Sequence, residues 1–177
     1  MQTKTDNSFL NEKIYLRYKN IKHMGKLSVL DCFHGSGHIW NNVQKIHKHE
    51  INIIAIDKKP YRKTLIGDNI KFLKSMDLNN FSCIDLDAYG IPYKQLDIVF
   101  NKKYKGIVFF TYIQTMFGAL PIEMLINIGY TKEMVKKCPF IFSKNMKNKL
   151  FDFLFKNNVK NIQYYLMNRK FYGCIVL

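Results

Sequence analysis

No apolar run in this sequence approaches the ~20 residues that a helix needs to span a membrane. Residues 1–8 are polar and lack the apolar stretch of a secretory signal. The sequence also contains no internal repeat, no low-complexity tract and no linker rich in Gly, Ser or Pro. Since domains cluster near ~100–150 residues, these absences predict one soluble, cytoplasmic domain over 1–177 that does not associate with membranes.

The four cysteines are scattered along the chain and form no Cys-x-x-Cys pair. A disulfide framework or a zinc site would need a recognisable spacing of such residues. His34 and His38 lie four residues apart, but no third ligand accompanies them. We therefore predict reduced thiols and no metal.

Acidic residues are scarce: 13 Asp and Glu stand against 28 Lys and Arg, which gives a formal net charge of +15. Such a charge attracts polyanions and speeds their encounter with the protein. Residues 132–170 hold many of the basic side chains, and the N-terminal segment adds Lys13, Arg17, Lys19 and Lys22. This balance favours a nucleic-acid partner. The competing interpretation is a set of solvated lysines that bind nothing acidic.

Short apolar segments alternate with segments of helical periodicity from residue 27 onward. Strands are expected at 27–30, 51–56, 64–66, 81–84, 106–112, 161–167 and 171–177. Strands that alternate with helices predict a parallel sheet covered on both faces, and the short spacing of the last two predicts an antiparallel hairpin. The expected fold is α/β: a doubly wound, mostly parallel, Rossmann-like sheet with a C-terminal antiparallel hairpin.

Within this domain, residues 1–25 are expected to form an N-terminal helix, 26–112 a cofactor-binding core with a reactive loop, and 113–177 further helices and the hairpin. The N-terminal helix is predicted over 8–24, with Gly25 ending it in a left-handed cap. Its expected buried stripe consists of Leu10, Ile14, Tyr18 and Ile21. Later helices are expected around 40–47 and 70–73, after Pro92, and at 121–128, 131–137 and 143–157.

Five of the acidic residues lie at the end of a predicted strand or directly after it: Asp31, Asp57, Asp68, Asp85 and Asp87. Ligands of open α/β sheets bind at the carboxyl ends of the strands. Turns and helix caps would explain any one of these acids. The ordered series favours a ligand that carries positive charge or many hydroxyl and amine donors.

A glycine loop, Gly35-Ser36-Gly37, follows the first predicted strand and lets the backbone approach a ligand closely. A dinucleotide fingerprint needs a third glycine where Trp40 stands, and no Gly-Lys-Ser/Thr follows the loop. The loop therefore disfavours NAD, FAD and the nucleotides that P-loops bind.

Two segments resemble a known family. The sequence VLDCFHGSG at 29–37, with Asp57 twenty residues past Gly37, is similar to the opening of class I S-adenosylmethionine-dependent methyltransferases. The sequence IDLDAYGIP at 84–92 resembles the Asp-Pro-Tyr/Phe-Gly loop of tRNA guanine-N2 dimethyltransferases and, more loosely, the reactive loop of amino-methyltransferases that act on nucleic-acid bases. The resemblance covers roughly 27–112.

This resemblance implies a cofactor, S-adenosylmethionine, and a role for each matching residue. Gly35 and Gly37 would pass beside its methionine part, near Phe33, and Asp31 would fix the amino group. The remaining implied roles are ribose binding by Asp57, adenine binding by Asp68, a cofactor contact by Asp85, acceptance of the substrate amine by Asp87 and stacking on the substrate base by Tyr89.

The resemblance thus implies N-methylation of an exocyclic base amine, in RNA before DNA. Two alternatives stay open: a DNA amino-methyltransferase, and a non-catalytic nucleic-acid-binding module that kept the fold. Ala88, in the place of a usual proline, and the ten residues between Asp57 and Asp68 favour the second. Because the chain ends at its last predicted strand, we expect substrate recognition by the domain's own surface, by a protein partner or by a second copy.

Overall fold

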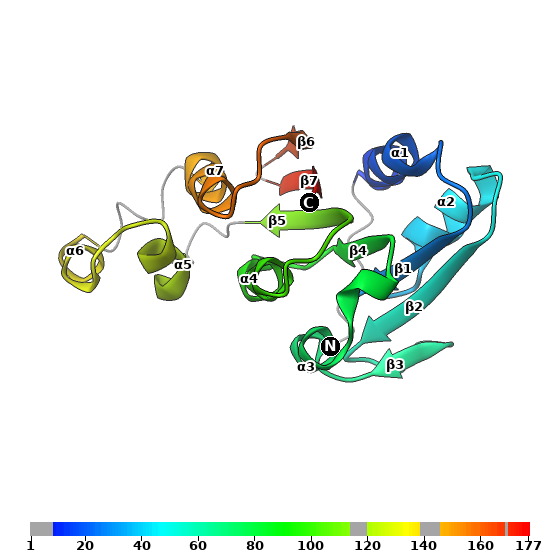
Figure 1. Cartoon of the computed structure of the whole chain (residues 1–177), viewed down its shortest axis with the longest axis horizontal. Coiled ribbons are helices and arrows are strands. Elements are labelled where there is room, and N and C mark those ends of the chain that lie inside the picture. Colours follow the sequence, from blue (N-terminus) through cyan, green and yellow to red (C-terminus); the bar gives the residue numbers. More distant parts are fainter. Residues whose placement is uncertain (1–8, 114–119, 139–145, 169) are drawn as a thin grey trace.

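Seven strands form one sheet in the order β3-β2-β1-β4-β5-β7-β6 in the computed structural model, which describes residues 9–113, 120–138, 146–168 and 170–177. The strands are β1 Leu27–Asp31, β2 Ile51–Asp57, β3 Thr64–Ile66, β4 Cys83–Leu86, β5 Ile107–Ile113, β6 Ile162–Met167 and β7 Lys170–Val176. Five strands run parallel, and β7 lies antiparallel between β5 and β6. The predicted fold class is confirmed (Figure 1).

The helices that connect and cover these strands are α1 Leu10–Ile21, α2 His38–Ile46, α3 Asn69–Ser75, α4 Tyr93–Asn101, α5 Ile122–Asn127, α6 Lys132–Lys137 and α7 Met146–Lys156, with a short 3-10 turn at Leu78–Asn80. Figure 1 shows α1 and α2 on one side of the sheet and α3 and α4 on the other. Residues 143–145 of the last predicted helix lie outside the described residues. No helix in the described ranges is long and apolar enough to cross a membrane.

The strands bury both faces because their side chains alternate between two cores. On β1, Val29 belongs to the core beneath α1 and α2, whereas Leu30 belongs to the larger core that α3, α4 and α7 cover. On β5, Phe109 and Phe110 divide in the same way. A strand's period of two thus explains why these segments read as continuous apolar runs.

The reversal of strand order lies between β1 and β4. From β1 the chain builds outward through β2 and β3, and it then returns to add β4 and β5 on the other side. In sheets of this kind the carboxyl ends of the two strands at the reversal open a crevice. The end of β1 carries Asp31 and the end of β4 carries Asp85, which are register partners.

Most strand boundaries lie within one residue of the prediction, and β4 differs most. Residues 81–84 were expected to form the strand and Asp85 to begin the loop, but β4 runs from Cys83 to Leu86. Asp85 stays in the strand because it has partners on both sides, Asp31 on β1 and Phe109 on β5. A carboxylate at this position therefore lies inside the sheet, where it needs buried partners.

The predicted face of α1 is only partly right. The most buried side chains of α1 are Lys13, Leu16, Arg17 and Ile21, whereas the expected stripe paired Ile21 with three residues that are only half-buried. The two basic residues, expected to face a substrate surface, point into the protein because Asp85 and Asp87 lie beneath them. The predicted end at Gly25 is wrong, since α1 ends at Ile21.

Candidate functional site

A cleft of about 790 Å³ opens at the carboxyl ends of β1, β2 and β4. This volume lies within the usual range for small-molecule and cofactor sites. Seven of the nine predicted site residues line it: Asp31, Phe33, Gly35, Asp57, Asp85, Asp87 and Tyr89. The remaining two, Gly37 and Asp68, lie outside this lining.

The glycine loop forms a turn at the floor of the cleft. Gly35 has a φ of 55°, and an added Cβ there would meet nothing within 4 Å, so the backbone presents an open side. Gly37 has a φ of 75°, and its Cβ would come 2.7 Å from His34 Nε2. Gly37 is therefore required by the close approach of His34 as well as by its backbone conformation, whereas Gly35 is favoured by its positive φ and lines the cleft.

Asp57, at the end of β2, accepts hydrogen bonds from two backbone groups. Its Oδ2 lies 2.8 Å from the Gly35 nitrogen and its Oδ1 lies 2.9 Å from the Lys59 nitrogen. The contact with Gly35 joins the end of β2 to the glycine turn. Each carboxylate oxygen keeps a second lone pair for a ligand.

Asp31 organises the start of the same turn. Its Oδ2 lies 2.9 Å from His34 Nδ1, and its Oδ1 accepts from the Phe33 nitrogen at 3.3 Å. The hydrogen bond to Asp31 raises the pKa of His34 above its usual 6.5, although partial burial opposes this. Asp31 therefore has an imidazole partner within the protein before any ligand amine arrives.

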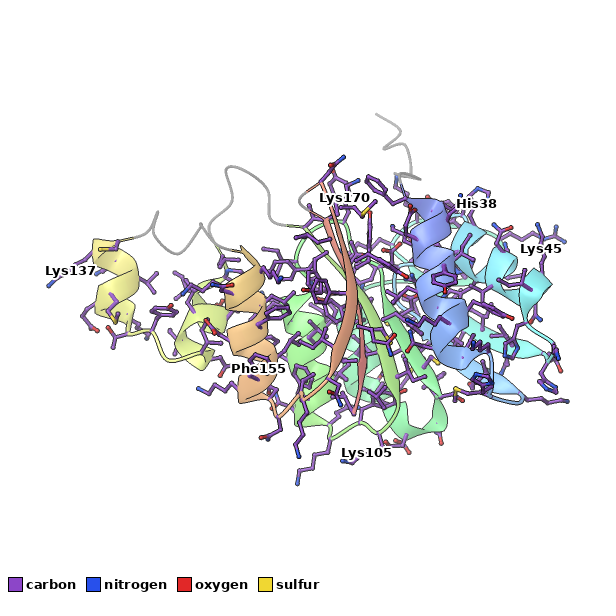
Figure 2. All side chains as sticks on the ribbon, turned by 90° about the horizontal axis from the view of Figure 1, so that it is seen from above. His38, Lys45, Lys105, Lys137, Phe155 and Lys170 are labelled. Atoms are coloured by element: carbon purple, nitrogen blue, oxygen red, sulfur yellow. The ribbon has the colours of Figure 1, made fainter. Side chains whose placement is uncertain are left out.

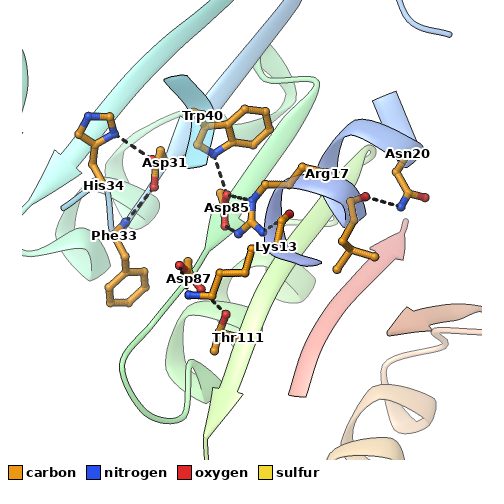
Figure 3. Close-up of polar contacts among 11 residues, drawn as sticks. Lys13, Arg17, Asn20, Asp31, Phe33, His34, Trp40, Asp85, Asp87 and Thr111 are labelled. Atoms are coloured by element: carbon orange, nitrogen blue, oxygen red, sulfur yellow. Dashed lines mark hydrogen bonds and ion pairs between the residues drawn. The ribbon is translucent and has the colours of Figure 1, made fainter. Parts of the chain in front are cut away.

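Asp85 is paired on all sides. Arg17 donates to both of its oxygens, with Nε to Oδ2 at 2.6 Å and Nη2 to Oδ1 at 2.7 Å, and Trp40 Nε1 donates to Oδ2 at 2.7 Å (Figure 3). Arg17 is 2% exposed and Asp85 1%. The predicted contact of Asp85 with the cofactor stays a prediction, while the donors show that its carboxylate is already used inside the protein.

Asp87 receives the other basic residue of α1. Lys13 Nζ lies 2.8 Å from Asp87 Oδ2, and the Thr111 hydroxyl donates to Oδ1. The Lys13 ammonium also lies 5.2 Å from the centre of the Tyr172 ring, a favourable cation–π position. The carboxylate that was predicted to take the substrate amine is thus held from both sides.

The two ion pairs share one geometric match. Lys13 and Arg17 are four residues apart on a helix, which advances about 6 Å, and Asp85 and Asp87 are two residues apart along an extended chain, which advances about 6.6 Å. Each cation therefore meets one acid. The two ion pairs also differ in burial, because Arg17 and Asp85 are less exposed than Lys13 and Asp87.

Burial raises the pKa of Asp85 to about 6, and Arg17 works against that rise. Burial also acts to raise the pKa of Asp87, but the charges of Lys13 and Arg17 and the hydrogen bonds from Lys13 and Thr111 outweigh it and lower the pKa of that group. Asp87 is therefore an anion at neutral pH and can only accept hydrogen bonds.

Tyr89 and Asp68 occupy contrasting positions. Tyr89 stands at the rim of the cleft with 87% of its surface exposed, which leaves its ring accessible to a ligand. The Asp68 side chain accepts from the Ile70 nitrogen at 3.0 Å and caps α3. The adenine contact predicted for Asp68 stays a prediction.

Sequence reasoning missed Lys13, Arg17 and Thr111 as residues of this site. Lys13 and Arg17 carried one usable signal, since both lie on the same side of an otherwise amphipathic helix, but their acidic partners are about seventy residues away in sequence. Thr111 looked like one residue of a buried strand. In the described part of the chain, no group of three or more His, Cys, Asp or Glu side chains is placed to hold a metal ion.

No protein-family model matches this sequence, and no curated protein matches it. Solved structures do share its fold. An S-adenosylmethionine-dependent methyltransferase from Archaeoglobus fulgidus is 13% identical with a TM-score of 0.57, over 94% of this chain and 93% of that chain. A precorrin-6y C5,15-methyltransferase from Geobacter metallireducens is 11% identical with a TM-score of 0.53, over 99% and 90%. The chain therefore has the Rossmann-like fold of these methyltransferases.

Replacing Arg17 by Met should destabilise the protein by about 3–5 kcal/mol, because it leaves the Asp85 carboxylate buried without its cation. Urea unfolding would measure the loss. Lys19→Met, on the exposed side of the same helix, is the matched control and should cost less than about 1 kcal/mol. An equal loss in both variants would contradict a special role for the buried pair.

His34 predicts a pH dependence of stability. Because its pKa is raised in the folded protein, the protonated ring stabilises the fold below pH 6.5, and that contribution is lost as the pH rises through the folded pKa. Asp31→Asn should return the His34 pKa toward 6.5, as followed by NMR titration of the imidazole protons. An unaltered titration in Asp31→Asn would refute the proposed cause of the shift.

Proposed function

We propose that this protein is an S-adenosylmethionine-dependent methyltransferase that methylates an exocyclic amine of a nucleic-acid base, in RNA rather than DNA. One observation supports the proposal most directly. The Asp57 carboxylate accepts a hydrogen bond from the Gly35 nitrogen inside a cleft at the strand reversal of a methyltransferase-like sheet. The assignment of a base amine as the substrate depends in addition on the sequence of the loop at 87–90 and on the net charge of +15.

The residues present fit the cofactor. Its ribose offers two hydroxyl donors, which the second lone pairs on the two Asp57 oxygens can accept. Its amino group is a cation suited to Asp31, and the open side of Gly35 leaves room for the chain between them. Phe33 contributes an apolar wall. When bound, the cofactor supplies a methyl group on positively charged sulfur.

Asp87 would position the substrate amine. An exocyclic base amine is a weak nucleophile because its lone pair is delocalised into the ring. By accepting its N–H bonds, Asp87 and a loop carbonyl such as that of Ala88 would favour a pyramidal nitrogen aimed at the methyl group. Thr111 and Lys13 fix the carboxylate, and such positioning contributes about 7–11 kcal/mol in well-oriented systems.

The low pKa of Asp87 defines what it does with protons. As an anion it orients the amine without removing a proton beforehand. The proton released from the methylated nitrogen would pass to solvent through the open mouth of the cleft. Tyr89, exposed at that mouth, would stack on the base, an interaction of about 1–3 kcal/mol.

Asp57→Ala should weaken S-adenosylmethionine binding roughly 10- to 100-fold, because hydrogen bonds to a charged acceptor contribute about 1.5–3 kcal/mol. Isothermal titration calorimetry measures the affinity directly. Asp152→Ala removes an exposed carboxylate from α7 and should leave it unchanged. If Asp57→Ala binds as tightly as the wild type, the cofactor assignment fails.

Asp87→Ala should lower the methyl-transfer rate about 100-fold or more, since misplacing a reacting group has effects of that size, while calorimetric binding of S-adenosylmethionine stays within a few fold. The assay is transfer of a radiolabelled methyl group to total RNA, DNA or protein. Label in RNA supports the proposal. Label in DNA favours the DNA alternative, and wild-type protein that binds RNA without labelling any polymer indicates the non-catalytic module.

A further inference from the structure

The connection between β2 and β3 is the most concentrated basic segment beside the cleft. It consists of residues 58–63, with the sequence KKPYRK, and four of these six residues are Lys or Arg while none is acidic. We call this segment the basic rim. It begins directly after Asp57, so its charge lies at the end of the strand that closes on the glycine turn.

Strand register keeps the basic rim at the cleft. β3 has three residues, and they pair with the last three residues of β2: Ala55 with Thr64, Ile56 with Leu65 and Asp57 with Ile66. The connection therefore needs no long return along the sheet and no helix, and it stays at the carboxyl edge. Lys59 and Tyr61 line the cleft itself.

Backbone contacts give the basic rim a defined turn. The Tyr61 nitrogen donates to the Lys59 carbonyl at 3.0 Å, and Thr64 donates to the Tyr61 carbonyl through its nitrogen at 3.3 Å and its hydroxyl at 2.7 Å. The four basic side chains, Lys58, Lys59, Arg62 and Lys63, are exposed. A surface of this kind presents its cations to solvent around one aromatic ring.

We propose that the basic rim binds the phosphates of the nucleic-acid strand whose base enters the cleft. The inference rests on the proposed function and assigns it a recognition surface. Cations arranged around an aromatic residue suit a single strand, because the cations follow the backbone and the ring offers a stacking surface. Tyr89 and Lys170 line the cleft from the β4 and β7 side, opposite β2 and β3 in the strand order.

The chain contains a competing basic surface. Lys132, Lys136 and Lys137 on α6 are exposed in the same way. Figure 2 shows Lys137 at one end of the molecule, away from Lys170 and His38, which line the cleft. Phosphates bound there would not bring a base to Asp87. This distal patch, defined by those three lysines, is therefore a control from which the same number of positive charges can be removed.

The experiment compares two triple variants that each remove three positive charges. The rim variant is K58Q/R62Q/K63Q, which leaves Lys59 in the cleft lining intact, and the distal variant is K132Q/K136Q/K137Q. Fluorescence anisotropy with a labelled, unstructured RNA of ~16 nucleotides measures affinity across a salt series. Circular dichroism melts check that both variants stay folded.

The rim variant should bind RNA roughly 10-fold more weakly at low salt, and the slope of log affinity against log salt should fall by about 2, since each single-strand phosphate contact contributes about 0.7. The distal variant should change the slope by less than about 1. Equal losses in the two variants, or a loss confined to the distal variant, would overturn the proposal.

Two further measurements separate this inference from the proposed function. Calorimetry should give the rim variant the wild-type affinity for S-adenosylmethionine, because Lys58, Arg62 and Lys63 lie outside the cleft lining, and a large loss there would overturn the separation of the basic rim from the cofactor site. The wild-type protein could bind RNA through the basic rim and yet transfer no methyl group. That result would contradict the proposed function and leave phosphate binding by the rim supported. Tighter binding to poly-glutamate than to RNA would overturn the inference alone.

Discussion

The pairing of Lys13 and Arg17 with Asp87 and Asp85 is the contact on which the rest of the site depends. Without it, two carboxylates would lie buried at the end of β4 with no cation between them. The pairing fixes which face of α1 meets the sheet, places Leu10 and Lys13 in the cleft wall and keeps Asp87 ionised. A feature that resembles a surface charge in the sequence is therefore part of the interior.

The acids of the cleft divide according to the partners that they have. Asp85 is paired with a guanidinium and an indole, Asp87 with an ammonium and a hydroxyl, and Asp31 with an imidazole. Asp57 accepts from two backbone N–H groups. A protein with 28 basic residues thus keeps a small acidic interior beside a basic exterior, which suits the proposed cationic cofactor and the proposed polyanionic substrate.

Much of this arrangement could be predicted from sequence, because strands buried on both faces appear as unbroken apolar runs and the glycine loop has a recognisable spacing. Seven strands and the terminal hairpin followed from those patterns. The orientation of α1 could not be predicted, because it depends on charges about seventy residues away that are brought near only by the sheet. The extension of β4 through Asp85 was missed for the same reason, since it depends on neighbours from two other strands.

The antiparallel strand β7 has a consequence for how the chain is made. It fills the place beside β5, yet it follows α5, α6, α7 and β6 in the sequence. The outer edge of β5 therefore has no neighbour while those four elements are synthesised, and an open strand edge is a template for unwanted pairing. Completion of this part of the sheet awaits a non-local contact, which is slow in folding, so the edge of β5 stays open until β7 has been synthesised.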